Sequence, residues 1–176
     1  MTVANDTIIW AKVKPNAIIP TRRNNDAGYD IYACIENDII IEPHKTVLIP
    51  TGIASAFSSD WYLQLQERGS TGVKGMGQRC GVIDSSFRGE WFAPITNHNN
   101  DTAIVLKTED WLDEKEEFHK LTRMYGTDLI IYPTTKAIAQ AVILPVPKLN
   151  HIEMTYQELL MIESERGLGC LGSSGR

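Results

Sequence analysis

The chain has 176 residues, of which 43% are hydrophobic and 22% charged, and these proportions exclude a disordered or collagen-like polypeptide and favour one folded domain. Its 17 basic and 22 acidic residues give a net charge of -5, which argues against nucleic acid or an anionic membrane as the main partner. No apolar run is long enough to span a membrane and no secretory signal is visible, so we expect a cytoplasmic protein. Cys34, Cys80 and Cys170 are far apart and form no CxxC pair, which predicts reduced thiols rather than disulfides or a zinc site.

Short apolar segments rich in Ile, Val, Tyr and Trp alternate with Gly, Pro, Asn and Asp, and this pattern predicts strands along most of the chain. In chain order the predicted strands are Ile8–Val13, Tyr29–Ala33, Ile39–Ile41, Thr46–Pro50, Ile53–Phe57, Tyr62–Gln66, Glu90–Asn97, Ala103–Leu106, Leu129–Tyr132 and Ile138–Val146. Many short strands at close intervals are typical of a β-sandwich or β-barrel. The sequence therefore predicts an all-β domain.

One acidic segment interrupts the strand pattern. Residues 108–121 (TEDWLDEKEEFHKL) carry Trp111, Phe118 and Leu121 at spacings that suit one face of a helix. We therefore expect a short helical insertion at about 108–126 in the β scaffold. A solvated helix without a partner is the simplest interpretation of this segment.

Two motifs place charged residues beside predicted strands. In AGYDIYA (27–33), Asp30 lies inside an apolar strand, where an unpaired carboxylate would be costly to bury, so it needs a partner. In ERGSTGVKG (67–75), a strand ends at Arg68 and passes into small residues, which suits either a phosphate-binding turn or an ordinary charged turn.

Two further motifs contain polar and small residues. GVIDSSFRGEW (81–91) predicts a β-hairpin with Asp84 and Phe87 in its turn, where an Asp beside two serines is ordinarily turn chemistry. RGLGCLGSSGR (166–176) is rich in glycine and serine, whose backbone N–H groups can surround phosphate oxygens. The alternative for this last motif is a solvated tail. It is not a Rossmann fingerprint, because too few residues follow it to form the required helix.

Together with AIAQAVILPV (137–146), these four stretches resemble, in order, the five motifs of the homotrimeric deoxyuridine triphosphatase (dUTPase) family. The resemblance implies a jelly-roll-like β-barrel of the β-clip type over residues 1–165, with a Gly-rich tail, residues 166–176, that closes over an active site between subunits. It also implies hydrolysis of dUTP to dUMP and pyrophosphate with Mg²⁺.

The same resemblance assigns roles to individual residues. Asp84 matches the carboxylate that activates the attacking water, Phe87 the aromatic residue that packs on the deoxyribose, and Asp30 a supporting carboxylate. The residues expected to bind substrate are Arg68, Gly69, Ser70, Gln78, Gly81, Ile83, Phe87, Gln140, Arg166, Leu171, Gly172 and Ser173. Mg²⁺ is expected to be held through substrate phosphates and water, without a direct protein ligand.

Four residues depart from the usual family pattern: Gly69, Ala137, Cys170 and Leu171. At Leu171 the aromatic residue that stacks on uracil is missing. Two alternatives remain open: a dCTP deaminase-like enzyme on a related scaffold, and a phage regulatory protein that binds a repressor through the insertion at 108–126.

Overall fold

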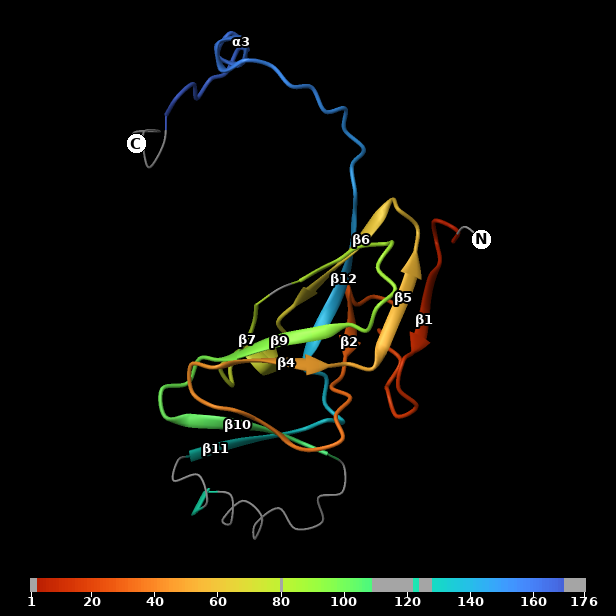
Figure 1. Ribbon diagram of the computed structural model, residues 1–176, viewed down its shortest axis with the longest axis vertical. Helices are drawn as coiled ribbons and strands as arrows, with labels where there is room; N and C mark the ends of the chain where they lie inside the picture. Colours follow the sequence, from red (N-terminus) through yellow and green to blue (C-terminus); the bar gives the residue numbers. More distant parts are fainter. Residues whose placement is uncertain (1–2, 80, 109–121, 124–127, 170–176) are drawn as a thin grey trace. The chain divides into compact units, whose positions relative to one another are not determined.

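The computed structural model describes residues 3–79, 81–108, 122–123 and 128–169 (Figure 1). The chain divides into two units, Met1–Val146 and Pro147–Arg176. All the strands that the structure describes belong to the first unit, and a single short helix is described in the second.

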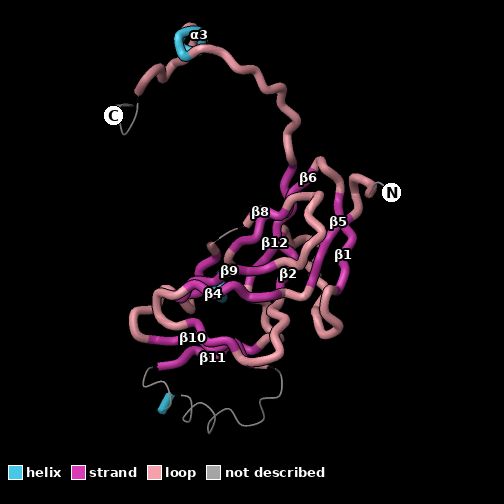
Figure 2. The backbone as a smooth tube through the Cα atoms, in the orientation of Figure 1, coloured by secondary structure: helices cyan, strands magenta, loops and turns pink. Residues whose placement is uncertain are grey.

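The regular secondary structure described in the first unit consists almost entirely of strands, which are joined by loops (Figure 2). These are β1 (Ile8–Lys12), β2 (Gly28–Ile31), β3 (Ile39–Ile41), β4 (Thr46–Pro50), β5 (Ile53–Phe57), β6 (Trp61–Gln66), β7 (Met76–Gln78), β8 (Val82–Ile83), β9 (Phe92–Asn97), β10 (Thr102–Lys107), β11 (Asp128–Pro133) and β12 (Ala139–Pro145). Within the described residues they pair into sheets ordered β1-β5, β11-β10-β3, β2-β12-β6-β8 and β4-β9-β7. The predicted all-β fold class is confirmed, although the strands that the structure describes form no closed barrel.

The hydrophobic core lies between these sheets. Its largest fully buried side chains include Trp91, Tyr132, Ile31, Ile49, Leu63, Leu65, Ile95, Ile104 and Leu106. Strand β10 is buried on both faces, because Ile104 and Leu106 enter the main core while Ala103 and Val105 join a second, smaller apolar cluster. This double burial explains why β10 is a continuous apolar run rather than an alternating one.

The sheet β2-β12-β6-β8 positions the polar residues of interest. β12 lies between β2 and β6, and in this register Gln140 faces Asp30 on one side and Gln66 on the other. In β6, Leu63 and Leu65 are buried whereas Gln64 and Gln66 are not, as expected for a strand with one buried face. The alternation in β6 therefore places glutamine side chains along one surface.

Two parts of the prediction need correction. The expected hairpin at 81–91 is wrong, because β8 pairs with β6 whereas β9 pairs with β4 and β7. The short strand β7 and the one-turn helix α1 (Gly69–Gly72) were not predicted at all. Helix α1 is fixed by buried Thr71, whose hydroxyl donates to the Arg68 carbonyl (2.9 Å) and accepts from the Arg68 N–H (3.1 Å).

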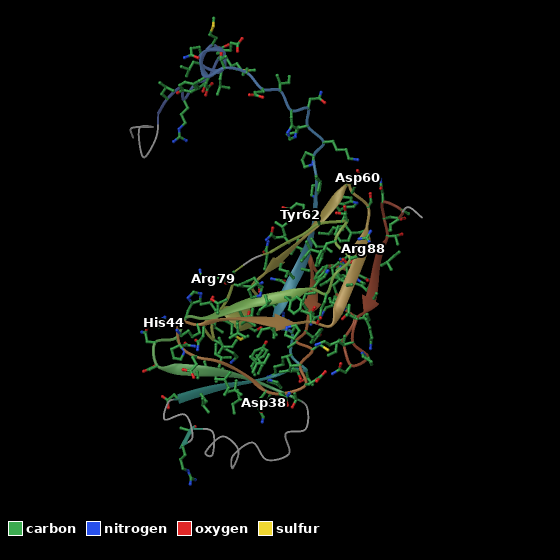
Figure 3. The ribbon with its side chains drawn as sticks, viewed as in Figure 1. Asp38, His44, Asp60, Tyr62, Arg79 and Arg88 are labelled. Atoms are coloured by element: carbon green, nitrogen blue, oxygen red, sulfur yellow. The ribbon has the colours of Figure 1, made fainter. Side chains whose placement is uncertain are left out.

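Strands β10 and β11 run parallel and lie side by side (Figure 1), so the chain between them must cross back along the sheet. The predicted helical insertion falls almost wholly on this crossover and lies outside the described residues, apart from Thr108 and residues 122–123. Where the crossover begins, Asp38 (labelled in Figure 3) pairs with Lys107 Nζ at 2.6 Å and accepts from the Thr108 N–H at 3.2 Å. The start of the insertion is thus tied to the loop before β3.

The second unit contains helix α3 (Tyr156–Leu160). It begins with a capping box, in which Thr155 accepts from the Glu158 N–H and Glu158 accepts from the Thr155 N–H. Hydrogen bonds from Thr155 hold the pKa of Glu158 below its ordinary value. Neither α1 nor α3 has the length and apolar character needed to cross a bilayer, and none of the other described residues form such a helix.

Candidate functional site

Asp30 and Arg68 form the best-defined charged pair near the predicted motifs. Arg68 Nε lies 3.0 Å from Asp30 Oδ1, and the two side chains are 29% and 36% exposed. Arg68 Nη1 also donates to Ser70 Oγ (3.2 Å) and to the Ala137 carbonyl (3.3 Å). The partner that Asp30 requires is therefore Arg68, and the Arg68 guanidinium is held from three sides.

Gln140 joins the same group of residues. Its Nε2 donates to the Glu67 carbonyl at 2.7 Å, and its side chain packs against Gly28 so closely that a Cβ there would lie 2.6 Å from Gln140 Oε1. A side chain at position 28 would therefore require the Gln140 amide to move. The amide position is set by both its acceptor and this close packing.

Asp30, Arg68 and Gln140 line one groove of about 640 Å³. The loop before β2 also lines this groove, with residues such as Arg22 and Arg23. Three arginines against two carboxylates, Asp26 and Asp30, leave this groove with a positive balance. An anion with several negative charges is the ligand that such a lining favours.

A second groove, of about 470 Å³, lies at the C-terminal part of β6 and is lined by Gln64, Gln66, Glu67, Gln78, Arg79 and Gly81 among others. Gln78 donates its backbone N–H to Glu67 Oε1 (3.0 Å), and Gly81 accepts from the Leu65 N–H (2.7 Å). Arg79, labelled in Figure 3, donates from Nε to Thr96 Oγ1 at 2.9 Å. Amide groups and backbone donors and acceptors suit a planar polar ligand.

Asp84 and Phe87 lie in the loop that follows β8. The Phe87 N–H donates to the Asp84 carbonyl at 3.1 Å, which closes the predicted turn even though no hairpin forms. Asp84 is exposed, Phe87 is 43% exposed with its ring packed on Gly89, and Ile83 just before them is buried. Arg88 Nη1 anchors the loop by donating to the carbonyls of Ser85 (2.6 Å) and Ser55 (3.3 Å), and Figure 3 shows Arg88 beside β5.

The tail residues are only partly described. Arg166 Nε donates to the Gly169 carbonyl at 2.8 Å, whereas Leu171, Gly172 and Ser173 lie outside the described residues. Gly69 belongs to α1, and a Cβ built there would meet no atom within 4 Å, so open space surrounds it. Cys34 is a free, buried thiol, whereas Cys80 and Cys170 lie outside the described part of the chain.

The structure therefore sorts the predicted residues into separate groups within the first unit. Asp30, Arg68 and Gln140 share one groove, and Gln78 and Gly81 share the other. Neither of these grooves is lined by Asp84, Ile83 or Phe87. Within the described residues, the predicted site residues therefore do not all line a single groove.

Sequence reasoning missed two residues that support these groups. Glu67 links both grooves, because its carbonyl accepts a hydrogen bond from the Gln140 amide and its carboxylate accepts one from the Gln78 N–H. The sequence feature that could have identified Glu67 is its position directly before Arg68. Buried Tyr132 donates to the Ala137 carbonyl (2.7 Å), the same oxygen that accepts from Arg68, and no local motif marks it. Burial raises the pKa of Tyr132, an effect partly offset by the Arg68 charge, so the phenol stays a donor.

Comparison with known proteins gives one consistent result. A family model described as dUTPase matches residues 14–111. The Deoxyuridine 5'-triphosphate nucleotidohydrolase of Picosynechococcus sp. is 30% identical over 93% of this chain and 95% of its own length. That of Nautilia profundicola is also 30% identical, over 94% of this chain and 96% of its own length.

Solved structures agree with the sequence relatives. The dUTPase of Staphylococcus bacteriophage 80alpha, solved with dUpNHpp, superposes with a TM-score of 0.69 at 25% identity and covers 97% of this chain and 99% of its own. A dUTPase variant from phage phi11 of S. aureus, solved to show a structural Mg(II) ion, matches in fold with a TM-score of 0.61 at 20% identity, over 86% of this chain and 99% of its own. The ordered motifs, the β-strand pairing and these relatives lead to one conclusion: the chain belongs to the dUTPase family.

Proposed function

We propose that this chain hydrolyses dUTP to dUMP and pyrophosphate. The observation that carries the proposal is the groove in which Arg68, held by Asp30, lies beside Gln140, in a chain whose curated relatives are named dUTP nucleotidohydrolases. A fixed guanidinium next to an amide donor suits a phosphate chain, because Arg recognises phosphate oxygens with paired hydrogen bonds. The family model and the relatives favour this activity over the deaminase alternative.

In the proposed site, the groove holds the triphosphate. Arg68 and Gln140 donate to phosphate oxygens, and Ser70, whose hydroxyl already contacts Arg68, supplies the donor that Gly69 lacks. The Asp30 carboxylate orients Arg68 and balances part of its charge. The open space around Gly69 lets phosphate oxygens approach the backbone of α1.

The second groove binds the base. Gln78 offers its side-chain amide, and the backbone at Gly81 and Ile83 offers donors and acceptors that mimic base pairing, which would reject cytosine. Phe87 packs on the deoxyribose and leaves no room for a 2′-hydroxyl, an assignment supported by its partial exposure at the loop surface.

Asp84 acts as the general base. Its carboxylate is exposed and takes a proton from the attacking water, whose oxygen forms a bond to the α-phosphorus. The bond from the α-phosphorus to the oxygen that bridges the α- and β-phosphates breaks, and pyrophosphate leaves. Such displacements depend mainly on positioning and charge stabilisation, which the arginine-lined groove can supply.

The chemistry of the groove fits Mg²⁺. Asp30 offers carboxylate oxygens and Gln140 an amide oxygen from facing positions on β2 and β12, and such oxygens can accept hydrogen bonds from the water molecules that Mg²⁺ keeps. Substrate phosphates and water would supply the ligands of the metal ion, without a direct ligand from the protein. When bound, Mg²⁺ neutralises charge on the phosphate chain.

A homotrimer would complete the site, and the separation of Asp84 and Phe87 from the Arg68 groove supports it. A neighbouring subunit would bring its Asp84 loop to this groove, while residues 166–176 of a third would close over it with Arg166, Leu171, Gly172 and Ser173. A cytoplasmic location is part of the same proposal and suits an enzyme that acts on free nucleotides.

The experiment is pyrophosphate release by the purified chain from dUTP, dCTP and UTP, with and without Mg²⁺. We expect turnover of dUTP alone, and only with Mg²⁺. Ammonia release from dCTP would instead identify a deaminase. Phe87→Ala should narrow the ratio of kcat/KM for dUTP and UTP, whereas an unchanged ratio with equal loss for both would make Phe87 a packing residue only.

A second role is supported by the phage relatives, one of which is described as controlling the transfer of virulence genes. The insertion at 108–126, which lies outside the described residues for most of its length, would bind a repressor through its acidic side chains. The test is a titration of the chain against candidate phage repressors, alongside a variant with the insertion acids replaced by Gln and Asn. Unchanged hydrolysis with lost binding supports the second role, and equal binding by both proteins contradicts it.

A further inference from the structure

We propose that Arg22 is an additional phosphate-binding residue in the groove of Asp30, Arg68 and Gln140. The inference rests on the proposed function, because it names a further contact to the same substrate. Arg22 lies on the loop before β2, outside the motif residues considered above, and it lines the same groove as Arg68.

Charge balance is the first argument. Asp30 lies 3.0 Å from Arg68, so these two residues together contribute little net charge to the groove. A nucleoside triphosphate carries several negative charges, and removing it from water requires further cationic donors. Arg22 and Arg23 are the other cations that line this groove.

The second argument is that the Arg22 side chain is already ordered. Its guanidinium carbon lies 5.1 Å from the centre of the Tyr29 ring, in a cation–π contact. Its Nη1 also donates to the Asp26 carbonyl at 2.8 Å. Both contacts hold the guanidinium in place without neutralising it, and Arg22 forms no ion pair with any residue that the structure describes.

Neighbouring Arg23 provides the contrast. Its side chain is 92% exposed, and its Nε lies 3.9 Å from Asp26 Oδ2, so its charge is both solvated and shared with a carboxylate. A fixed, unshared guanidinium loses less conformational entropy when it binds phosphate than a mobile one does. Arg22 and Arg23 are therefore a matched pair: adjacent, exposed residues of equal charge, of which Arg22 has the cation–π contact and the short hydrogen bond, and Arg23 has the ion pair.

The position of Tyr29 explains how the arrangement is built. Tyr29 lies in β2 directly before Asp30, and its ring also contacts Trp10 with a centroid distance of 5.7 Å. Because the ring is braced by the core, it offers a rigid surface for the guanidinium. Strand β2 thus supports two cationic groups of the groove, Arg22 through Tyr29 and Arg68 through Asp30.

The test compares Arg22→Gln with Arg23→Gln in calorimetric titrations with the dUTP analogue dUpNHpp and with deoxyuridine, which has no phosphate. Arg22→Gln should weaken dUpNHpp binding by about tenfold or more, the effect of losing a charge-assisted hydrogen bond, and leave deoxyuridine binding unchanged. Arg23→Gln should weaken dUpNHpp binding by no more than about threefold. Tyr29→Leu, which keeps the charge but removes the ring, should give an intermediate loss.

Three results would overturn the inference: parental affinity of Arg22→Gln for dUpNHpp, equal losses in both arginine variants, or an equal loss for deoxyuridine. Thermal unfolding of each variant separates lost binding from lost folding. Hydrolysis of dUTP by the parent is measured separately. If the parent binds dUpNHpp through Arg22 but releases no pyrophosphate, the proposed function fails and the inference stands; if it hydrolyses dUTP and Arg22→Gln binds normally, only the inference fails.

Discussion

Replacing Gly81 with alanine should disturb both the second groove and the pairing of β8 with β6. A Cβ at this position would lie 2.7 Å from the Leu65 carbonyl oxygen and would also collide with the Gln64 side-chain amide. The Gln64 amide can rotate away at little cost. The Leu65 carbonyl is main chain inside β6, so relief requires the two backbones to separate.

The size of the effect follows from those contacts. Separation weakens the bond from the Leu65 N–H to the Gly81 carbonyl, now 2.7 Å, which is worth about 1 kcal/mol net. Overpacking adds about 1–3 kcal/mol, and the reduced freedom of the unfolded chain returns about 0.4–1 kcal/mol. We therefore expect Gly81→Ala to lower the free energy of unfolding by about 1–3 kcal/mol. The displaced groove should also raise KM for dUTP by about tenfold.

Urea denaturation and steady-state hydrolysis of dUTP measure the two effects. Gly72→Ala is the matched control, because its nearest neighbour is Glu67 Oε2 at 3.9 Å and a helical site favours alanine over glycine by about 1 kcal/mol. If Gly81→Ala were as stable as Gly72→Ala and kept the parental KM, the close approach of Gly81 to β6 would play no part in stability or binding.

Four further outcomes are expected. Gly28→Ala should push the Gln140 amide off the Glu67 carbonyl and lower kcat/KM for dUTP by about tenfold, with thermal stability changed by no more than about 1 kcal/mol. Asp84→Asn should remain folded by circular dichroism while kcat falls by roughly 10²–10⁴, because an amide cannot accept the proton. Cys34, which is 4% exposed and whose thiol pKa is raised by burial, should react with iodoacetamide far more slowly than free cysteine at pH 8 and become labelled only on unfolding, as read by peptide mass spectrometry. Truncation after Glu165 should leave thermal unfolding without ligand unchanged and lower kcat/KM by an order of magnitude or more.

Each of these has a clear contrary result. Parental kcat/KM in Gly28→Ala would mean that the Gln140 amide does not touch the phosphates. Hydrolysis within threefold of the parent by Asp84→Asn would remove Asp84 as the base. Rapid labelling of native Cys34 would show that its burial is transient, and full activity after truncation would make residues 166–176 a solvated end.

The sequence predicted correctly those strands that are marked by their own apolar residues. β3, β4 and β5 have the bounds expected from their apolar runs, and Asp30 has the partner that its place in a strand required. β7 was missed because its sequence, MGQ, carries no strand pattern, and only its pairing with β9 makes it a strand. The hairpin at 81–91 was wrong for the same reason, since β8 is stabilised by β6, distant in sequence.

In the candidate site, too, the sequence identified residues that belong to local motifs and missed one that depends on contacts between distant parts of the chain. The motifs identified Arg68, Gln140 and Asp30, and these three share a groove. The motifs could not identify Tyr132, because it contributes a single hydrogen bond to the Ala137 carbonyl. That carbonyl lies near Arg68 only in the folded chain, since the two residues are far apart in sequence. Helix α3 had a usable signal that was overlooked, namely Thr155 followed three residues later by Glu158.

The parallel pairing of β10 with β11 affects how this protein can evolve. A strand of six residues is about 20 Å long at 3.3 Å per residue, so roughly six extended residues could span the distance back to the start of β11. The segment 108–127 is far longer than that minimum. A tight turn could never replace it, because it would reverse the direction of β11, yet doubling the length of such a connection costs only about 0.6 kcal/mol. The fold therefore demands a connection here while leaving its length and composition almost free, so new binding surfaces can be acquired at this point without altering the strands that carry Asp30, Arg68 and Gln140.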